Sequence, residues 1–231
     1  MTSLRILSTL AVMGAMRDLT AQYKTETGTD ITADFAPTVA LLDRLRAKEI
    51  ADIAILTAQG IDDLTRESII RPNTRTDVAL SFVGIAVKAG APKPDIATVD
   101  AFKTTLLAAR SVAYAKIGAS GIFFAGLIQR LGIATEINAK AVIVPAGFTA
   151  ERLVSGEADL AVQQISELMV VPGIEVVGPL PAEIQTTATF SAGLLTAATQ
   201  PDQAAAFLRF LASPTNAEAL RRAGLEPAAT V

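Results

Sequence analysis

Short apolar or alternating runs, typical of strands, alternate along the chain with stretches whose apolar residues recur every three or four positions, typical of helices. The expected strands are residues 4–7, 30–35, 51–56, 77–88, 112–114, 141–144, 158–162, 174–178 and 186–198. The expected helices are one that ends near residue 25, before Gly28, and residues 38–48, 61–67, 99–108, 122–131, 148–156, 204–211 and 216–223. This alternation predicts an α/β fold of mostly parallel sheets flanked by helices.

Two long extended segments, 77–88 and 186–198, enclose a middle block of the sequence. We interpret them as crossover strands between two lobes, with residues 1–80 and 193–231 in lobe 1, residues 81–192 in lobe 2 and a ligand cleft between the lobes. A single large doubly wound domain remains the alternative, because 231 residues suit either arrangement.

Polar turns follow two of the expected strands in the segment 116–167. Gly118-Ala119-Ser120-Gly121 opens a helix, and small residues there let backbone amides and the positive end of the helix approach a guest. Gln163 and Gln164 stand where the strand 158–162 is expected to end. Ligands of α/β folds bind at such positions, so the segment predicts a small-anion site. The glycine spacing of phosphate loops and dinucleotide-binding turns is absent.

Composition excludes several chemistries. The chain has no His and no Cys, which excludes an imidazole base, a thiol nucleophile and the usual zinc sites. We expect no metal and no cofactor. The net charge is −3 and no basic stretch occurs, so nucleic acid is not an expected partner. No apolar run is long enough to insert in a membrane.

The first 16 residues superficially look like a short signal peptide, but their pattern fits a first strand that leads into a helix. As written, the chain carries no export signal, which predicts a cytoplasmic protein. A periplasmic location is expected instead if the chain is a trimmed mature form.

Read in order, the segments ILSTLAVMGAMRDL, YKTETGTDITADFAPTVALLDRL, ADIAILTA, IGASG, RLVSGEADLAVQQISE and AAAFLRFLASPTNAEALRRAGLEP resemble the bacterial molybdate-binding proteins and their relatives. These are substrate-binding proteins of the two-lobed type II periplasmic class. The resemblance implies that two lobes close around an oxyanion and hold it with hydroxyls and backbone amides at helix N-termini. It also implies delivery of the ligand to a membrane-bound ABC transporter complex if the chain is exported.

Carried over position by position, the resemblance places the ligand contacts in five turns. Their residues are Ser8, Thr9 and Leu10; Thr38 and Val39, with Thr38 as the N-cap of its helix; Ser120 and Gly121; Gly147 and Phe148; and Gln163 and Gln164.

Departures from the family pattern disfavour molybdate. Ala11 replaces a Ser after the first strand, Gln164 replaces a Tyr, and a Pro usual in the third turn is missing. Lys116 stands just before that turn and joins the expected ligand contacts. A Lys beside the turn and amide side chains that donate N–H suit a larger organic anion such as a carboxylate.

A second interpretation follows from the resemblance, because some similar proteins are enzymes, aconitate isomerase among them. Such an enzyme moves a proton across an allylic system and needs a base at a substrate carbon. Lys116 and Ser120 are the catalytic candidates. Glu167 is expected to charge the start of a short helix, with a role as base the lesser alternative. A cytoplasmic ligand sensor is a third interpretation, for which the sequence shows no effector segment.

Overall fold

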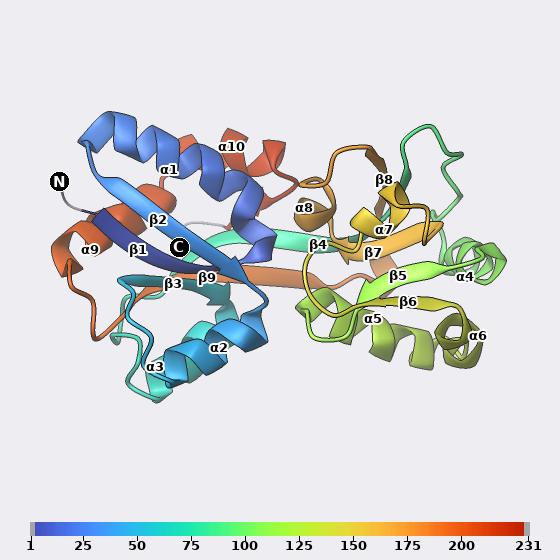
Figure 1. The fold of residues 1–231 in the computed structure, drawn as a ribbon, viewed down its shortest axis with the longest axis horizontal. Coiled ribbons are helices and arrows are strands. Elements are labelled where there is room, and N and C mark those ends of the chain that lie inside the picture. Colours follow the sequence, from blue (N-terminus) through green and yellow to red (C-terminus); the bar gives the residue numbers. More distant parts are fainter. Residues whose placement is uncertain (1–2, 229–231) are drawn as a thin grey trace. The chain divides into compact units, whose positions relative to one another are not determined.

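A computed structural model describes residues 3–228 of the chain, so both ends of the predicted lobe 1, residues 1–2 and 229–231, lie outside the described part (Figure 1). The chain divides into two compact units, one formed by Met1–Ser81 and Ala188–Val231 and the other by Phe82–Thr187. It passes between them within β4 (Thr76–Lys88) and at the start of β9 (Thr187–Leu194).

The first unit is built on a mixed sheet with the strand order β2-β1-β3-β9. β1 (Ser3–Thr9) pairs in parallel with β2 (Asp30–Ala36) and β3 (Ile53–Thr57), while β9 is antiparallel to β3. The two-residue strand β10 (Glu226–Pro227) is antiparallel to β4. Thr9 is opposite Ala36, so β1 and β2 end at the same edge of the sheet.

Helices cover both faces of this sheet (Figure 1). Its helical segments are η1 (Leu10–Val12), α1 (Met13–Thr27), α2 (Thr38–Arg46), α3 (Ala58–Arg66), α9 (Pro201–Leu211), η3 (Pro214–Asn216) and α10 (Ala217–Arg222). Successive strand residues face opposite sides. Leu4 and Ile6 therefore pack with α1, α9 and α10, whereas Leu7 packs with α2 and α3.

The second unit has the strand order β4-β7-β5-β6, with β8 (Ile174–Pro179) also paired to β4. β5 (Val112–Ala115) lies in parallel between β6 (Ala141–Val144) and β7 (Leu160–Gln164). β4 is antiparallel to both β7 and β8. Each unit thus joins three parallel strands to antiparallel ones, and each sheet is mixed.

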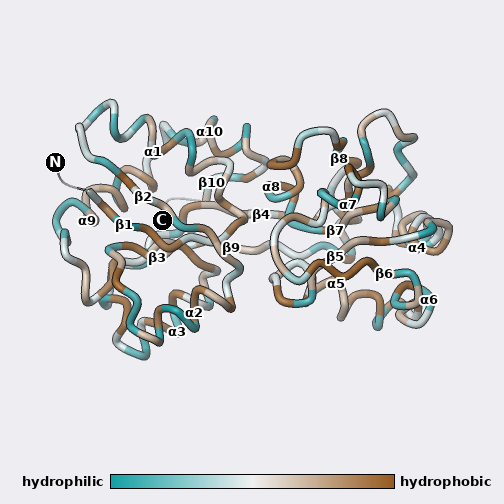
Figure 2. Tube along the Cα trace, in the orientation of Figure 1, coloured by the Kyte–Doolittle hydropathy of each residue, from teal (hydrophilic) through white to brown (hydrophobic). Residues whose placement is uncertain are grey.

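The second unit's helical segments are α4 (Val99–Ala108), α5 (Ala119–Arg130), α6 (Ala134–Ala139), α7 (Glu151–Val154), α8 (Ile165–Leu168) and η2 (Ala182–Ile184). Strands β5 and β6 are hydrophobic in sequence (Figure 2). Val112 and Tyr114 face the large core formed with α4, α5 and α6. Ala113 and Ala161 face the opposite side, where the short helices α7 and α8 pack.

Several element boundaries differ from those expected. The helix expected at 122–131 begins at Ala119, because Gly118 in extended conformation is its N-cap. The strand expected at 158–162 runs from Leu160 to Gln164, so both glutamines belong to the strand instead of following it.

Other predicted segments are shorter. The helix expected at 148–156 contracts to Glu151–Val154, and the strand expected at 186–198 ends at Leu194. Helix α6, which separates α5 from β6, was not predicted.

Gly121 lies where the first turn of α5 packs against the end of β5. A Cβ atom at Gly121 would lie 1.4 Å from the carbonyl oxygen of Ala115, a backbone atom that cannot move aside alone. The close approach of this helix to the strand therefore requires glycine. Gly126 lies five residues later in the same helix. An added Cβ atom there would have one neighbour within 4 Å, the Arg130 guanidinium at 3.6 Å.

Asp52 connects three distant segments of the first unit. Its side chain is 2% exposed and accepts the Arg5 amide at 2.9 Å, the Thr199 amide at 2.8 Å and the Gln200 amide at 3.0 Å. Its own carbonyl accepts the Leu195 amide at 2.9 Å. One buried carboxylate thus connects the residues just before α9 to strand β1 and to the start of β3.

We expect Gly121→Ala to lower the free energy of unfolding by about 3 kcal/mol or to prevent folding, since the new methyl overlaps backbone. Gly126→Ala, the matched control in the same helix, is expected to stabilise by about 0.5–1 kcal/mol through helix propensity. Urea unfolding followed by circular dichroism measures both. Equal effects of the two substitutions would contradict the packing described.

Asp52→Ala is expected to cost about 2–4 kcal/mol, because it leaves buried backbone amides without an acceptor. Glu218→Ala, which removes an exposed carboxylate from α10, is expected to change stability by less than about 0.5 kcal/mol. Thermal unfolding of both variants provides the comparison, and a neutral Asp52→Ala would show that water replaces the carboxylate.

Candidate functional site

The turn between β5 and α5 exposes Lys116 and buries Ser120. Ser120 is 2% exposed and is the second residue of α5. Within residues 3–228 its hydroxyl has no hydrogen-bond partner. The helical bonds begin with the Ile122 amide to Gly118 O, which leaves the amides of the first three helical residues without an intrahelical acceptor. This turn therefore offers backbone and hydroxyl donors, as the sequence predicted.

The turn before α7 is held by the side chain of Gln163. The Gln163 carboxamide oxygen accepts the Thr149 amide at 2.8 Å and the Thr149 hydroxyl at 3.0 Å. Its nitrogen donates to the Gly147 carbonyl at 3.1 Å. Gly147 adopts a φ of 90°, which favours glycine, and Phe148 is half-buried beside it. Gln163 therefore fixes the turn that carries two predicted contacts.

Gln164 and Glu167 lie at the end of β7 and in the short helix that follows. Gln164 is 2% exposed, and its carboxamide oxygen has no hydrogen-bond partner among the described residues. Glu167 is 8% exposed. Burial raises the pKa of Glu167 to about 7, opposed by hydrogen bonds from the Gln164 backbone and the Gln163 side chain.

Glu167 lies in the first turn of α8, as expected from the sequence. Its burial was not foreseen. The signal available in the sequence is an acidic residue flanked by apolar ones in ISELMVV. Because burial raises its pKa to about 7, Glu167 titrates near neutrality in a chain that has no histidine.

Sheet topology brings the predicted residues of the second unit to one edge. β5, β6 and β7 are parallel, with Ala115 opposite Val144, so the turns that follow these strands lie at the same end of the sheet. Lys116, Ser120, Gly147 and Gln164 are therefore neighbours by topology. Lys116 is exposed and lines a hollow of about 470 Å³ with Ile122 and Ile143.

In the first unit, the predicted residues follow β1 and β2. Ser8 and Thr9 are buried at the end of β1, and the Ser8 hydroxyl donates to the Thr9 carbonyl at 3.2 Å. Leu10 begins η1. Thr38 is the first residue of α2 and not its N-cap, a position that Pro37 occupies. Val39 is 45% exposed.

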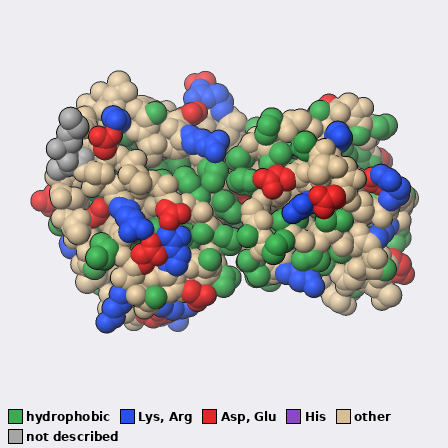
Figure 3. All heavy atoms as spheres, in the orientation of Figure 1, with side chains coloured by type: hydrophobic (Ala, Val, Ile, Leu, Met, Phe, Trp, Pro, Cys, Tyr) green, Lys and Arg blue, Asp and Glu red, His purple; other side chains and the backbone are tan. Residues whose placement is uncertain are grey.

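Charged side chains of the first unit pair with one another and not with the predicted turns. Arg44 contacts both Asp34 and Glu49, and Arg46 contacts Glu67. On the face shown in Figure 3, basic and acidic side chains are interspersed. Hydroxyls and amides are thus the main donors at the turns. Within residues 3–228, no three His, Cys, Asp or Glu side chains gather as a metal site.

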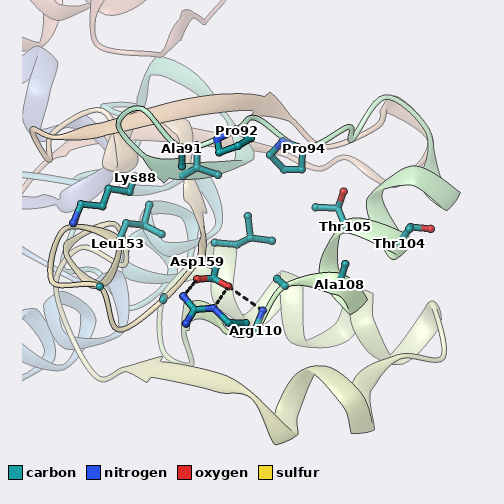
Figure 4. Close-up of a pocket in the computed structure, with 15 residues that line it drawn as sticks. Lys88, Ala91, Pro92, Pro94, Thr104, Thr105, Ala108, Arg110, Leu153 and Asp159 are labelled. Atoms are coloured by element: carbon teal, nitrogen blue, oxygen red, sulfur yellow. Dashed lines mark hydrogen bonds and ion pairs between the residues drawn. The ribbon is translucent and has the colours of Figure 1, made fainter.

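The cavity shown in Figure 4 lies elsewhere in the second unit and includes none of the predicted residues. It measures about 530 Å³, and its walls include Pro92, Pro94 and Leu153. Its Arg110 and Asp159 are occupied with each other, the Arg110 amide donating to the Asp159 carboxylate at 3.0 Å. These features do not suit a small anion.

No helix of the described chain combines the length and apolar character required to cross a bilayer.

Solved structures share the fold. The periplasmic molybdate-binding protein of Azotobacter vinelandii superposes with a TM-score of 0.82 at 15% identity, over 98% of this chain and all of that chain. Peb3 of Campylobacter jejuni, solved with L-phospholactate, superposes with a TM-score of 0.73 at 16% identity, over 97% of this chain and all of the Peb3 chain. The predicted fold class, a two-lobed type II periplasmic-binding-protein fold, is confirmed.

An aconitate isomerase from a Pseudomonas species is 36% identical over 232 aligned residues, which cover 98% of this chain and 88% of the relative. The resemblance to the molybdate-binding-like proteins and to the subgroup of aconitate isomerase is thus confirmed. Because residues 4–226 match the family model described as bacterial extracellular solute-binding protein, the chain belongs to that family.

Proposed function

We propose that the chain is a substrate-binding protein for a small organic polycarboxylate and that it prefers such a ligand to molybdate. The observation that carries the proposal is the edge of the second unit where Ser120, the Gly147 turn and Gln164 gather. The buried Gln164 carboxamide oxygen needs a donor, and a fully deprotonated oxyanion offers only acceptors. A ligand that carries a hydroxyl or a protonated carboxyl can supply one.

The relatives support a carboxylate. Aconitate isomerase, at 36% identity, acts on a tricarboxylate according to its name, whereas the molybdate-binding protein shares 15% identity. Lys116 adds a cation at the edge of the same turn and makes no ion pair within residues 3–228.

The proposal extends to both predicted lobes, residues 1–80 with 193–231 and residues 81–192. Ser8, Thr9, Leu10, Thr38 and Val39 would contribute contacts from the first of them, and the ligand would be enclosed as the lobes close. The family description as extracellular supports work outside the cytoplasm, with delivery to an ABC transporter.

A second candidate function is isomerisation of an unsaturated polycarboxylate such as aconitate. The observation in its favour is a carboxyl at the site, Glu167, whose pKa of about 7 suits proton transfer at neutral pH. In this reaction a base removes a proton from the methylene carbon and a proton returns to the far carbon of the double bond, so the substrate formula is unchanged. Lys116 and Ser120 would hold carboxylates or assist the transfer.

Calorimetric titration with trans-aconitate, citrate, tricarballylate, molybdate and sulfate tests the binding function. We expect micromolar binding of a polycarboxylate and binding of molybdate weaker by about 100-fold. Ser120→Ala should weaken polycarboxylate binding about tenfold through loss of a hydrogen bond to a charged group. Ser3→Ala, an exposed serine at the start of β1, is the matched control. Micromolar molybdate binding would refute the preference.

Isomerase activity is tested by proton NMR of cis-aconitate incubated with the protein in deuterated buffer. Turnover should yield trans-aconitate, and Lys116→Ala should lower kcat/KM by about 100-fold if Lys116 holds a carboxylate in the transition state. Lys103→Ala, which alters a half-buried lysine of α4 outside the predicted turns, serves as control. Binding of aconitate without turnover would exclude the isomerase function and would be consistent with a substrate-binding protein.

A further inference from the structure

Glu167 is a buried carboxyl whose hydrogen-bond partners come from the strand that precedes it. The Gln164 backbone and the Gln163 side chain stabilise its ionised form, while desolvation disfavours that form. Within the described part of the chain, no cation is among the groups that influence its titration. Its charge is therefore balanced by hydrogen bonds alone.

The elements packed against α8 supply no compensating charge. α8 contacts β7, β8 and, through Ile165, Gly84 of β4, and β7 contains no ionisable residue. The one ionisable residue of β8, Glu175, accepts the Gly90 amide at 3.0 Å and pairs with Lys93 at 3.3 Å.

Two basic groups of β4 and of α7 are also engaged. Arg152 of α7 pairs with Glu157 at 2.9 Å. Lys88 of β4 donates to the Val154 carbonyl at 3.2 Å.

The same glutamines join Glu167 to the proposed anion contacts. Gln163 holds the turn that carries Gly147, and Gln164 is itself a proposed contact with a buried, unpartnered oxygen. An anion bound here adds a second negative charge beside the Glu167 carboxylate. In a poorly solvated environment two such charges repel strongly, so the pair favours a state in which one of them is neutralised.

We propose that the site takes up one proton with its anion, and that Glu167 is the group that binds this proton. The inference rests on the proposed function, since it places the ligand at Gly147 and Gln164. The proton comes from solvent and forms an O–H bond on the carboxyl, and nothing else changes covalently. In a chain without histidine, Glu167 then makes anion binding dependent on pH.

The sign follows from linkage. Below pH 7 Glu167 is already protonated in the free protein, so anion binding is accompanied by the uptake of few protons and the affinity for the anion is high. Above pH 7 the proton must be acquired, so affinity falls. For one linked proton, affinity should fall about tenfold between pH 6 and pH 8, and proton uptake should approach one at pH 8.

Calorimetric titration of the full chain with trans-aconitate, in buffers of different ionisation enthalpy, measures this uptake. Glu167→Gln should lose both the uptake and the pH dependence. Glu175→Gln, a carboxyl of the same unit that is already paired, should keep both. The ligand's own carboxyls titrate alike in all three proteins, so the difference between wild type and Glu167→Gln isolates Glu167.

A second measurement does not depend on the variants. The carboxyl carbon of Glu167, followed by NMR in wild-type protein, should titrate near neutrality and shift to a higher midpoint when trans-aconitate is bound. Binding without proton uptake, or with an unchanged midpoint, would overturn the inference and leave the proposed function intact. Absence of heat with every polycarboxylate would refute the proposed function instead, whereas a free-protein midpoint below about 5.5 would overturn the inference by itself.

Discussion

Parallel alignment of β5, β6 and β7 is the constraint on which the rest of the site depends. Parallel neighbours direct all their carboxyl ends to one edge, so three turns that are far apart in sequence become neighbours. Each turn then leads into a helix or a short helical segment, and its free amides face the same region. Gly121 permits this arrangement, since any side chain there would separate α5 from β5.

Within that frame, polar groups divide into those that build the turns and those left for a guest. The Gln163 carboxamide bonds Thr149 and Gly147 and also the Glu167 carboxyl, so it holds the geometry of a turn. Among the residues that the structure describes, the Ser120 hydroxyl and the Gln164 carboxamide oxygen have no partner. Two adjacent glutamines of one strand thus have different tasks, because successive strand residues face opposite sides of a sheet.

The sequence predicted most of the fold because its signals were local. The helix 99–108 and the strand 141–144 match α4 and β6, and Thr98 caps α4 by accepting the Ala101 amide. The sequence predicts a turn at the two glutamines, because polar side chains at the end of a strand give the same pattern whether they are buried or exposed. No local pattern marks Asp52, because its partners Thr199 and Gln200 lie nearly 150 residues away in the sequence. Burial of Glu167 depends on the packing of β7 and β8, and the apolar residues around it in ISELMVV are its local sign in the sequence.

A shared fold leaves binding and isomerisation equally accessible, since both need an anion held by hydroxyls and amides. What separates them physically is a group able to exchange a proton near neutral pH. A carboxylate on the surface cannot serve, because water keeps it ionised. Burial without a cation, as at Glu167, changes that balance, since the charged form loses hydration and gains only hydrogen bonds. Desolvation raises the proton affinity of such a carboxylate. The same property that lets it bind a proton when an anion binds would let it remove a proton from a substrate carbon. Proton-coupled binding and proton-transfer catalysis are therefore alternative uses of one physical feature, and they differ in whether the substrate carbon comes within reach of that carboxyl.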